Sequence, residues 1–155
     1  MTSHSTPAQI RVIEAGLACC GVEAAAVDLV QEAQVLANAD VASHILVIAG
    51  TVTHALADTV RQAYQQLTEP RVVVAFGACA ITGGPYWDSY SVIPGADHVI
   101  PVDFHVPGCP PTPEDLALAL QRAAQQVTGV QVHTSESPVV TPTGQFGFSS
   151  GEVIT

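Results

Sequence analysis

The sequence predicts an α/β domain in which four mostly parallel strands form one sheet with helices on both faces. Short apolar runs alternate with longer segments in which apolar residues recur every three or four positions, as strands and helices do when they alternate. His44–Ala49 is almost entirely apolar, which is typical of a strand buried on both faces. Together these features favour a parallel sheet covered by helices.

The first strand is expected at Gln9–Glu14, and Gly16 ends it. A helix follows, with an apolar face formed by Val22, Ala25, Ala26, Leu29, Val30, Ala33 and Leu36. After the strand His44–Ala49, a turn at 50–53 leads into a second helix. The apolar face of that helix is formed by Leu56, Val60, Ala63, Tyr64 and Leu67.

Pro70 ends the second helix, and a third strand is expected at Val72–Phe76. The connection over residues 79–99 is rich in turn formers, and a structureless stretch of that length is usually functional. A fourth strand is expected at Val99–Val106, where Pro101 indicates a sheet edge or a bulge.

The last helix has a strong start signal, because Thr112 offers an N-cap hydroxyl and Pro113 suits the first helical position. Its apolar face is formed by Leu116, Ala119, Leu120, Ala123, Ala124 and Val127, and Gly129 ends it. We therefore expect a single α/β domain over residues 1–129. Residues 130–155, rich in Ser, Thr, Gly and Pro, are expected to form an extended, irregular tail.

The charge of the chain argues against two kinds of partner. The formal net charge is −10, and there is no lysine, whereas nucleic acids and anionic lipid heads require a basic face. No signal peptide is visible in Met1–Gln9, and the longest apolar run is too short to cross a bilayer. We expect a cytoplasmic protein, in which cysteines indicate metal or redox chemistry.

Four cysteines follow three of the expected strands. Cys19 and Cys20 follow the first strand, Cys79 the third and Cys109 the fourth. Ligands of parallel sheets bind beyond the carboxyl ends of the strands, so we expect the four thiols to share one site. Four thiolates suit a [4Fe-4S] cluster and also a structural zinc ion, although the paired Cys-x2-Cys spacing of zinc sites is absent. A disulfide between Cys19 and Cys20, and inert buried thiols at Cys79 and Cys109, are the alternatives.

Several motifs in sequence order resemble one family. They are Gly-Leu-Ala-Cys-Cys-x-Val-Glu from Gly16, Ala-Gly-Thr from Ala49, Glu-Pro-Arg from Glu69, Gly-Ala-Cys-Ala from Gly77, and Ile-Pro-Val-Asp-x-x-Val-Pro-Gly-Cys-Pro-Pro from Ile100. The family they resemble is the subunit of respiratory complex I that carries the terminal iron–sulfur cluster, which is related to the small subunits of nickel–iron hydrogenases. The resemblance spans roughly Gly16 to Val127.

This resemblance implies a flavodoxin-like fold and a [4Fe-4S] cluster bound by Cys19, Cys20, Cys79 and Cys109. It implies electron transfer from a ferredoxin-like subunit toward a quinone, beside a large catalytic subunit that closes the quinone pocket. The complex would lie on the inner face of the cell membrane, and this subunit would reach the membrane only through its partners. The alternative is a small subunit of a membrane-bound [NiFe] hydrogenase-like or formate-hydrogenlyase-like complex, in which two residues usually separate the first two cysteines.

Glu23, Asp103 and His105 are candidates for coupling proton uptake to reduction of a cluster, because each lies near a cysteine in the sequence. For Asp103 and His105 the alternative is an ordinary strand residue with a satisfied hydrogen bond. Two other classes of function remain open: a zinc-stabilised module without a redox role, and a flavin-binding relative of flavodoxin. The loop after the first strand lacks the Ser/Thr-rich phosphate-binding sequence that FMN requires.

Overall fold

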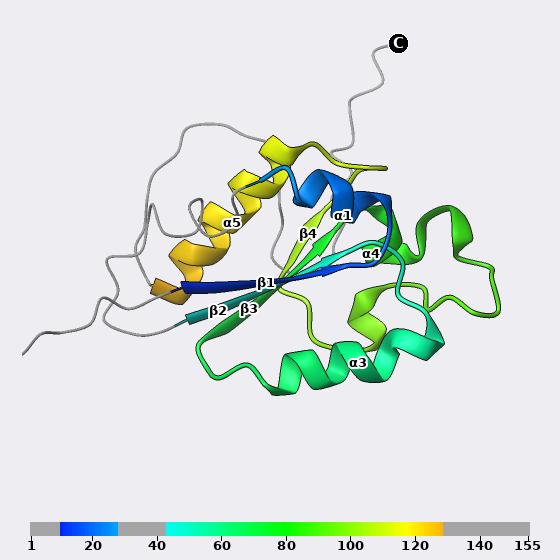
Figure 1. Ribbon diagram of the computed structural model, residues 1–155, viewed down its shortest axis with the longest axis horizontal. Helices are drawn as coiled ribbons and strands as arrows, with labels where there is room; N and C mark the ends of the chain where they lie inside the picture. Colours follow the sequence, from blue (N-terminus) through cyan, green and yellow to red (C-terminus); the bar gives the residue numbers. More distant parts are fainter. Residues whose placement is uncertain (1–9, 28–42, 129–155) are drawn as a thin grey trace, which may run out of the picture.

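The computed structural model describes residues 10–27 and 43–128 of the chain (Figure 1). Its four strands are all parallel and lie in the order β1-β2-β3-β4. Their bounds are β1 Ile10–Gly16, β2 Ser43–Ala49, β3 Arg71–Phe76 and β4 Phe104–Val106. The flavodoxin order is 2-1-3-4-5, and without its second strand it has the same neighbours as this sheet. The predicted fold class is therefore confirmed.

Helices cover both faces of this sheet (Figure 1). One face packs against α1 (Cys19–Ala24) and α5 (Pro113–Thr128), and the other against α3 (His54–Gln65) and α4 (Ala78–Thr82). Two short 3-10 helices, η1 (Gly84–Tyr86) and η2 (Ala96–His98), lie between α4 and β4. Within the described ranges, no helix is both long enough and apolar enough to cross a membrane.

The central strands β2 and β3 supply both hydrophobic cores, because successive side chains of a strand point to opposite faces. Val47, Val74 and Phe76 pack toward α5, whereas Ile48 and Val73 pack toward α3. Small residues on the helices, such as Ala and Val, allow the helices to approach the sheet closely. Since a shift of one residue would exchange the two faces, this burial fixes the register of the strands.

The first helix differs from its prediction. Of the segment predicted to form the first helix, only Cys19–Ala24 is helical among the described residues. The buried side chains of this short helix are Cys20 and Ala24. Val22, which was expected on the buried face, is 73% exposed, and Ala25 and Ala26 are also exposed. The small helix is oriented by the buried Cys20 rather than by an apolar stripe. The rest of the predicted stripe, from Leu29 to Leu36, and the tail at 130–155 lie outside the described residues.

The fourth strand is shorter than predicted, and the connection before it is more ordered. Pairing begins where Asp103 N donates to Val73 O at 2.9 Å, because Pro101 has no N–H and Val99 N instead bonds back into η2. The connection contains α4, η1 and η2. An isolated β-bridge between Thr53 and Val92 joins it to the segment just before α3. The expectation of a structureless loop at 79–99 was therefore wrong.

The start of α5 follows its prediction. Thr112 Oγ1 accepts a hydrogen bond from Asp115 N at 3.2 Å, and Asp115 Oδ2 accepts one from Thr112 N at 3.1 Å. This reciprocal pair satisfies two N–H groups that the first turn of a helix leaves without partners. The N-cap hydroxyl expected at Thr112 is therefore confirmed, and Asp115 completes the cap.

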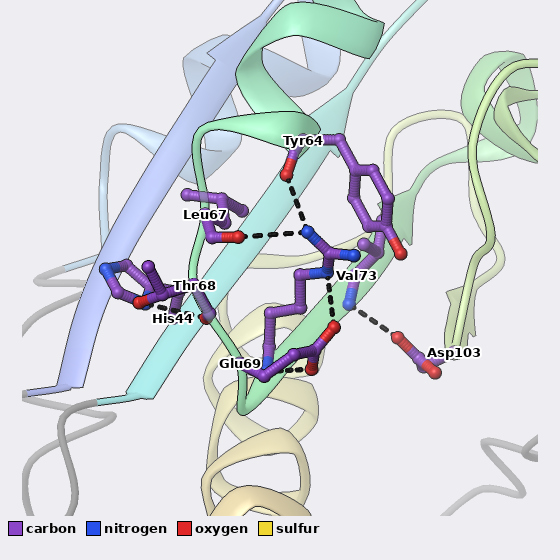
Figure 2. Close-up of polar contacts among 8 residues, drawn as sticks. His44, Tyr64, Leu67, Thr68, Glu69, Val73 and Asp103 are labelled. Carbon is purple, nitrogen blue, oxygen red and sulfur yellow. Dashed lines mark hydrogen bonds and ion pairs between the residues drawn. The ribbon is translucent and has the colours of Figure 1, made fainter.

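A network of polar side chains closes the amino-terminal edge of the sheet (Figure 2). Arg71 Nη1 donates to the carbonyl oxygens of Leu67 at 2.9 Å and Tyr64 at 3.2 Å, and the guanidinium lies 4.0 Å from the centre of the Tyr64 ring. Its Nε forms an ion pair with Glu69 Oε1 at 2.8 Å, although the angle falls outside that of a hydrogen bond. Arg71 therefore ties the end of α3 to the start of β3.

Replacing Arg71 by methionine is expected to lower the free energy of unfolding by about 1.5–3 kcal/mol, because two helix-end carbonyls lose a charged donor. Arg61→Met is the matched control, since Arg61 pairs only with the exposed Asp58 and its loss is expected to cost less than about 1 kcal/mol. Urea unfolding of both variants measures the difference. Equal losses in the two variants would show that Arg71 has no special role.

Candidate metal centre

The four cysteines lie at the carboxyl-terminal edge of the sheet, as their positions in the sequence predicted. Cys19 and Cys20 begin α1 directly after β1, Cys79 lies in α4 after β3, and Cys109 follows β4. Cys20 and Cys79 are buried, whereas Cys19 and Cys109 are exposed. All four are free thiols, so the structure contains no disulfide between Cys19 and Cys20.

The four sulfur atoms are close enough to influence one another. Burial, the charge and hydrogen bond of Cys19, and the charges of Cys79 and Cys109 together raise the pKa of Cys20 to about 11. Coulomb interactions of this kind weaken with distance, so the thiols of three separate loops must lie in one region. These interactions support the expected convergence of the four thiols, which stays a prediction.

Backbone hydrogen bonds join these loops to one another. Leu17 N donates to Ala49 O at 2.9 Å, which ties the loop after β1 to the end of β2. Gly77 N donates to Val106 O and Ala78 N to Gly108 O, both at 2.8 Å. The second pair of bonds holds the loop of Cys79 against the loop of Cys109, so their separation is set by the backbone.

Two glycines bring the backbone against the buried sulfurs. Gly77 has a φ of 95°, and a Cβ at this position would occupy the space of Cys20 Sγ. At Gly84, with a φ of 57°, a Cβ would lie 2.8 Å from Cys79 Sγ. Any side chain would displace a sulfur at either place, and positive φ values also favour glycine. The glycines therefore create the room that the two buried thiols occupy.

The number of thiols at this edge of the sheet fits a four-thiolate ligand set. A tetrahedral zinc site holds its sulfurs about 3.8 Å apart, because each Zn–S bond is about 2.3 Å long. Among the described side chains, no group of three or more His, Cys, Asp or Glu residues is arranged to hold one metal ion. Four cysteines match the number of thiolates that bind a [4Fe-4S] cluster and also the number in a four-cysteine zinc site, so the kind of metal centre stays a prediction.

The three candidate proton-coupling residues occupy different places. Glu23 lies one helical turn after Cys19 and Cys20 on α1, is half-buried, and has no hydrogen bond or ion pair within the described part of the chain. Asp103 lies near the opposite end of β4, where its Oδ2 accepts a hydrogen bond from Val73 N at 2.8 Å (Figure 2). His105 lies on β4, and its buried Nδ1 has no hydrogen-bond partner within residues 10–27 and 43–128.

For Asp103, the hydrogen bond matches the alternative of an ordinary, satisfied strand residue. Val106, at the end of β4, lies three positions after Asp103, and a strand rises about 3.3 Å per residue. Asp103 therefore lies about 10 Å from the edge that carries the cysteines. His105 does not match that alternative, because its Nδ1 is unsatisfied.

Sequence reasoning overlooked Glu14, a half-buried carboxyl on β1 that lies beneath the loop of Cys19 and Cys20. Burial raises its pKa above the ordinary value. The available signal was an acidic residue inside an otherwise apolar strand, with Gly16 two positions later. The sequence alone does not show that this acid lies beneath the cysteine loop, because its position depends on the contact between Gly16 and Gly21.

Comparison with known proteins identifies the family. The family model of the 20 kDa subunit of NADH ubiquinone oxidoreductase matches residues 13–123. An NADH-quinone oxidoreductase subunit of Streptomyces griseus is 40% identical over 122 residues, which cover 75% of this chain and 52% of that protein. The corresponding subunit of Salinispora tropica is 41% identical over 122 residues, which cover 75% of this chain and 65% of that protein. The chain thus spans about half to two thirds of the length of these relatives.

A solved structure supports the same fold. A chain of the membrane-bound sulfane sulfur reductase, an archaeal respiratory membrane complex, superposes with a TM-score of 0.54 and is 25% identical. The superposition covers 79% of this chain and 72% of that chain. Because the family model extends over most of the sequence and includes all four cysteines, this chain belongs to the family of the 20 kDa subunit of NADH ubiquinone oxidoreductase.

Proposed function

We propose that this protein is the electron-transfer subunit of a membrane-associated respiratory oxidoreductase and passes electrons through one [4Fe-4S] cluster toward a quinone. The observation that carries the proposal is the position of four free cysteines just after three parallel strands that end at the same edge of the sheet. Cys19, Cys20, Cys79 and Cys109 are the proposed ligands. Family membership supports the proposal, since relatives that are about 40% identical are named as subunits of NADH-quinone oxidoreductase.

When bound, the cluster supplies a one-electron carrier, so the chain needs no nucleophile and no general acid. The protein residues hold and tune it. Each cysteine must lose its proton to become a ligand; for Cys20, burial opposes that loss, as its raised pKa shows. The backbone at Gly77 and Gly84 lies against the buried sulfurs, and close polar backbone groups are among the factors that set cluster potentials.

The proposed partners follow from what remains uncovered around the site. Cys19 and Cys109 are exposed, and large apolar side chains near the cysteine-bearing helices are exposed as well: Val22, Tyr86, Trp87 and Tyr90. A large catalytic subunit covers this side in the proposed complex, and a ferredoxin-like subunit delivers electrons. The protein would then be peripheral on the inner face of the cell membrane and bound to it only through its partners.

The terminal acceptor has a second candidate. The solved neighbour belongs to a sulfane sulfur reductase complex rather than to a quinone reductase, and it shares the fold of this chain. A related membrane complex with a different acceptor, such as the hydrogenase-like complexes considered above, therefore remains the alternative. In both cases the four cysteines would hold the cluster that carries the electrons.

Anaerobic purification of the full chain is expected to give a brown protein with about four iron and four sulfide per chain. Reduction is expected to produce a low-temperature EPR signal. The colour distinguishes the alternatives, because a zinc protein is colourless and a flavoprotein has a structured yellow spectrum. A colourless protein with one zinc per chain would refute the proposed cofactor.

In the same preparation, Gly77→Ala is expected to lose most of its iron per folded chain, because the added methyl takes the space of Cys20 Sγ. Gly95→Ala is the matched control. Gly95 also has a positive φ, of 124°, but its Cβ would meet Ile81 O and no sulfur. Both variants carry backbone strain, and only the first disturbs a thiol. Equal iron content in the two variants would contradict the proposed role of the glycine.

Glu23 is proposed to couple proton uptake to reduction of the cluster, because it follows the paired cysteines by one helical turn. Glu23→Gln is expected to reduce the pH dependence of the midpoint potential in a redox titration. Asp103→Asn serves as the control, since Asp103 is bonded to Val73 N away from the cysteines. A midpoint potential that does not change with pH in the unaltered protein would exclude proton coupling by Glu23 and by His105.

A further inference from the structure

Both backbone polar groups of one buried residue, Val73, are bonded to the residue just before the edge strand β4. Asp103 N donates to Val73 O at 2.9 Å, and Val73 N donates to Asp103 Oδ2 at 2.8 Å. Figure 2 shows the carboxyl of Asp103 directed at Val73 N. Val73 lies inside β3 and is 1% exposed, so its N–H depends on a partner from the protein. Asp103 therefore supplies both hydrogen bonds with which the pairing of β3 and β4 begins.

The carboxylate takes the place of a main-chain acceptor. In a regular parallel ladder, the N–H and C=O of one residue bond to two residues of the neighbouring strand that lie two positions apart. Since Val73 O accepts from Asp103 N, Val73 N would then donate to the carbonyl of Pro101. Pro101 has no N–H to continue a ladder, and Val99 N bonds back to Ala96 O. The side chain of Asp103 thus starts the ladder where the preceding backbone runs outside the sheet.

The strand β4 depends on this contact because it is short. Its three residues all pair with β3, and Phe104 and Val106 are buried toward α5. Burial of alternate side chains excludes a slip of one residue, which would exchange the two faces, but a slip of two residues keeps each side chain on its face. Asp103 is the one carboxyl within residues 99–109. A slip of two residues would take it away from Val73 N, so Asp103 fixes the register that burial leaves open.

The far end of β4 leads directly to the loop of Cys109. There Ala78 N donates to Gly108 O at 2.8 Å, and these two residues directly precede Cys79 and Cys109. A displacement of β4 along β3 would move one of these cysteines relative to the other. The register that Asp103 fixes at one end of β4 therefore sets the relative position of two cysteines at the other end.

We infer that Asp103 is a positioning residue: through β4 it holds Cys109 at the separation from Cys79 that a shared cluster requires. This inference rests on the proposed function, because it needs a cluster at the cysteines. Asp103 does not touch the cluster in this arrangement, since about 10 Å of strand lie between it and the edge that carries the cysteines. It acts through its two hydrogen bonds, and neither a proton nor an electron is transferred at this residue.

Amide hydrogen exchange of the full chain, purified anaerobically, tests whether the effect of Asp103 reaches the cysteine loops. Asp103→Ala removes the acceptor of Val73 N. The amides of Gly77 and Ala78 are then expected to exchange about tenfold faster, because an unsatisfied buried donor favours local opening of the strand. Asp103→Asn keeps an oxygen acceptor and is expected to restore slow exchange. Asp97→Ala, which removes the same charge from an exposed residue of η2, is the matched control and is expected to leave both amides unchanged.

The cluster itself gives a second readout on the same variants. Asp103→Ala is expected to hold less iron per folded chain than the unaltered protein. The cluster that remains is expected to give a broadened EPR signal, because Cys109 is no longer held in one position. Asp103→Asn is expected to restore both the iron content and the line shape, which the loss of a carboxylate charge alone would not do.

A third measurement needs no variant. In the unaltered chain, the amides of Val73, Gly77 and Ala78 are expected to exchange through one shared opening, with the same dependence on urea. Separate openings would overturn the inference. Faster exchange at Val73 alone in Asp103→Ala, with an unchanged EPR signal, would also overturn it and leave the proposed function intact. An unaltered protein without iron would instead overturn the proposed function.

Discussion

The structure depends on the way in which backbone hydrogen bonds continue past the ends of the parallel strands. Leu17 N bonds to Ala49 O, Gly77 N to Val106 O and Ala78 N to Gly108 O, so each loop that carries cysteine is joined to a neighbouring strand or loop. The strands have a fixed register because β2 and β3 are buried on both faces. The buried sheet thereby fixes the positions of the four cysteines, of which Cys20 and Cys79 are themselves buried in the core.

The two edges of the sheet perform different tasks. At the amino-terminal edge, Arg71 and Asp103 use their polar atoms on backbone groups of α3 and β3, which stabilises the fold. At the carboxyl-terminal edge, Glu14, Glu23 and the thiols remain without cationic partners among the described residues. The polar groups of the amino-terminal edge are thus bound by the fold itself, whereas Glu14 and Glu23 have no hydrogen bond or ion pair within the described residues.

Much of this arrangement was predictable from the sequence, and the failures have identifiable causes. The cysteine edge was predictable because each cysteine follows an apolar run, and parallel strands end together. The orientation of α1 was not, because alanine and valine on several sides give no distinct stripe, and the buried Cys20 decided it. Asp103 was misleading because an extended strand lies between it and Cys109, so the two residues are far apart in space although they are close in the sequence. The position of Glu14 beneath the cysteine loop could not be predicted, because it depends on a contact between Gly16 and Gly21 that the sequence does not reveal.

The composition of the chain bears on how the added charge of an electron is balanced. There is no lysine among 155 residues and only four arginines. Arg61 and Arg71 are paired with acids beside α3, and Arg11 lies on β1 with its side chain exposed. Fixed cations near the cysteines are therefore scarce, in a chain whose net charge is already −10.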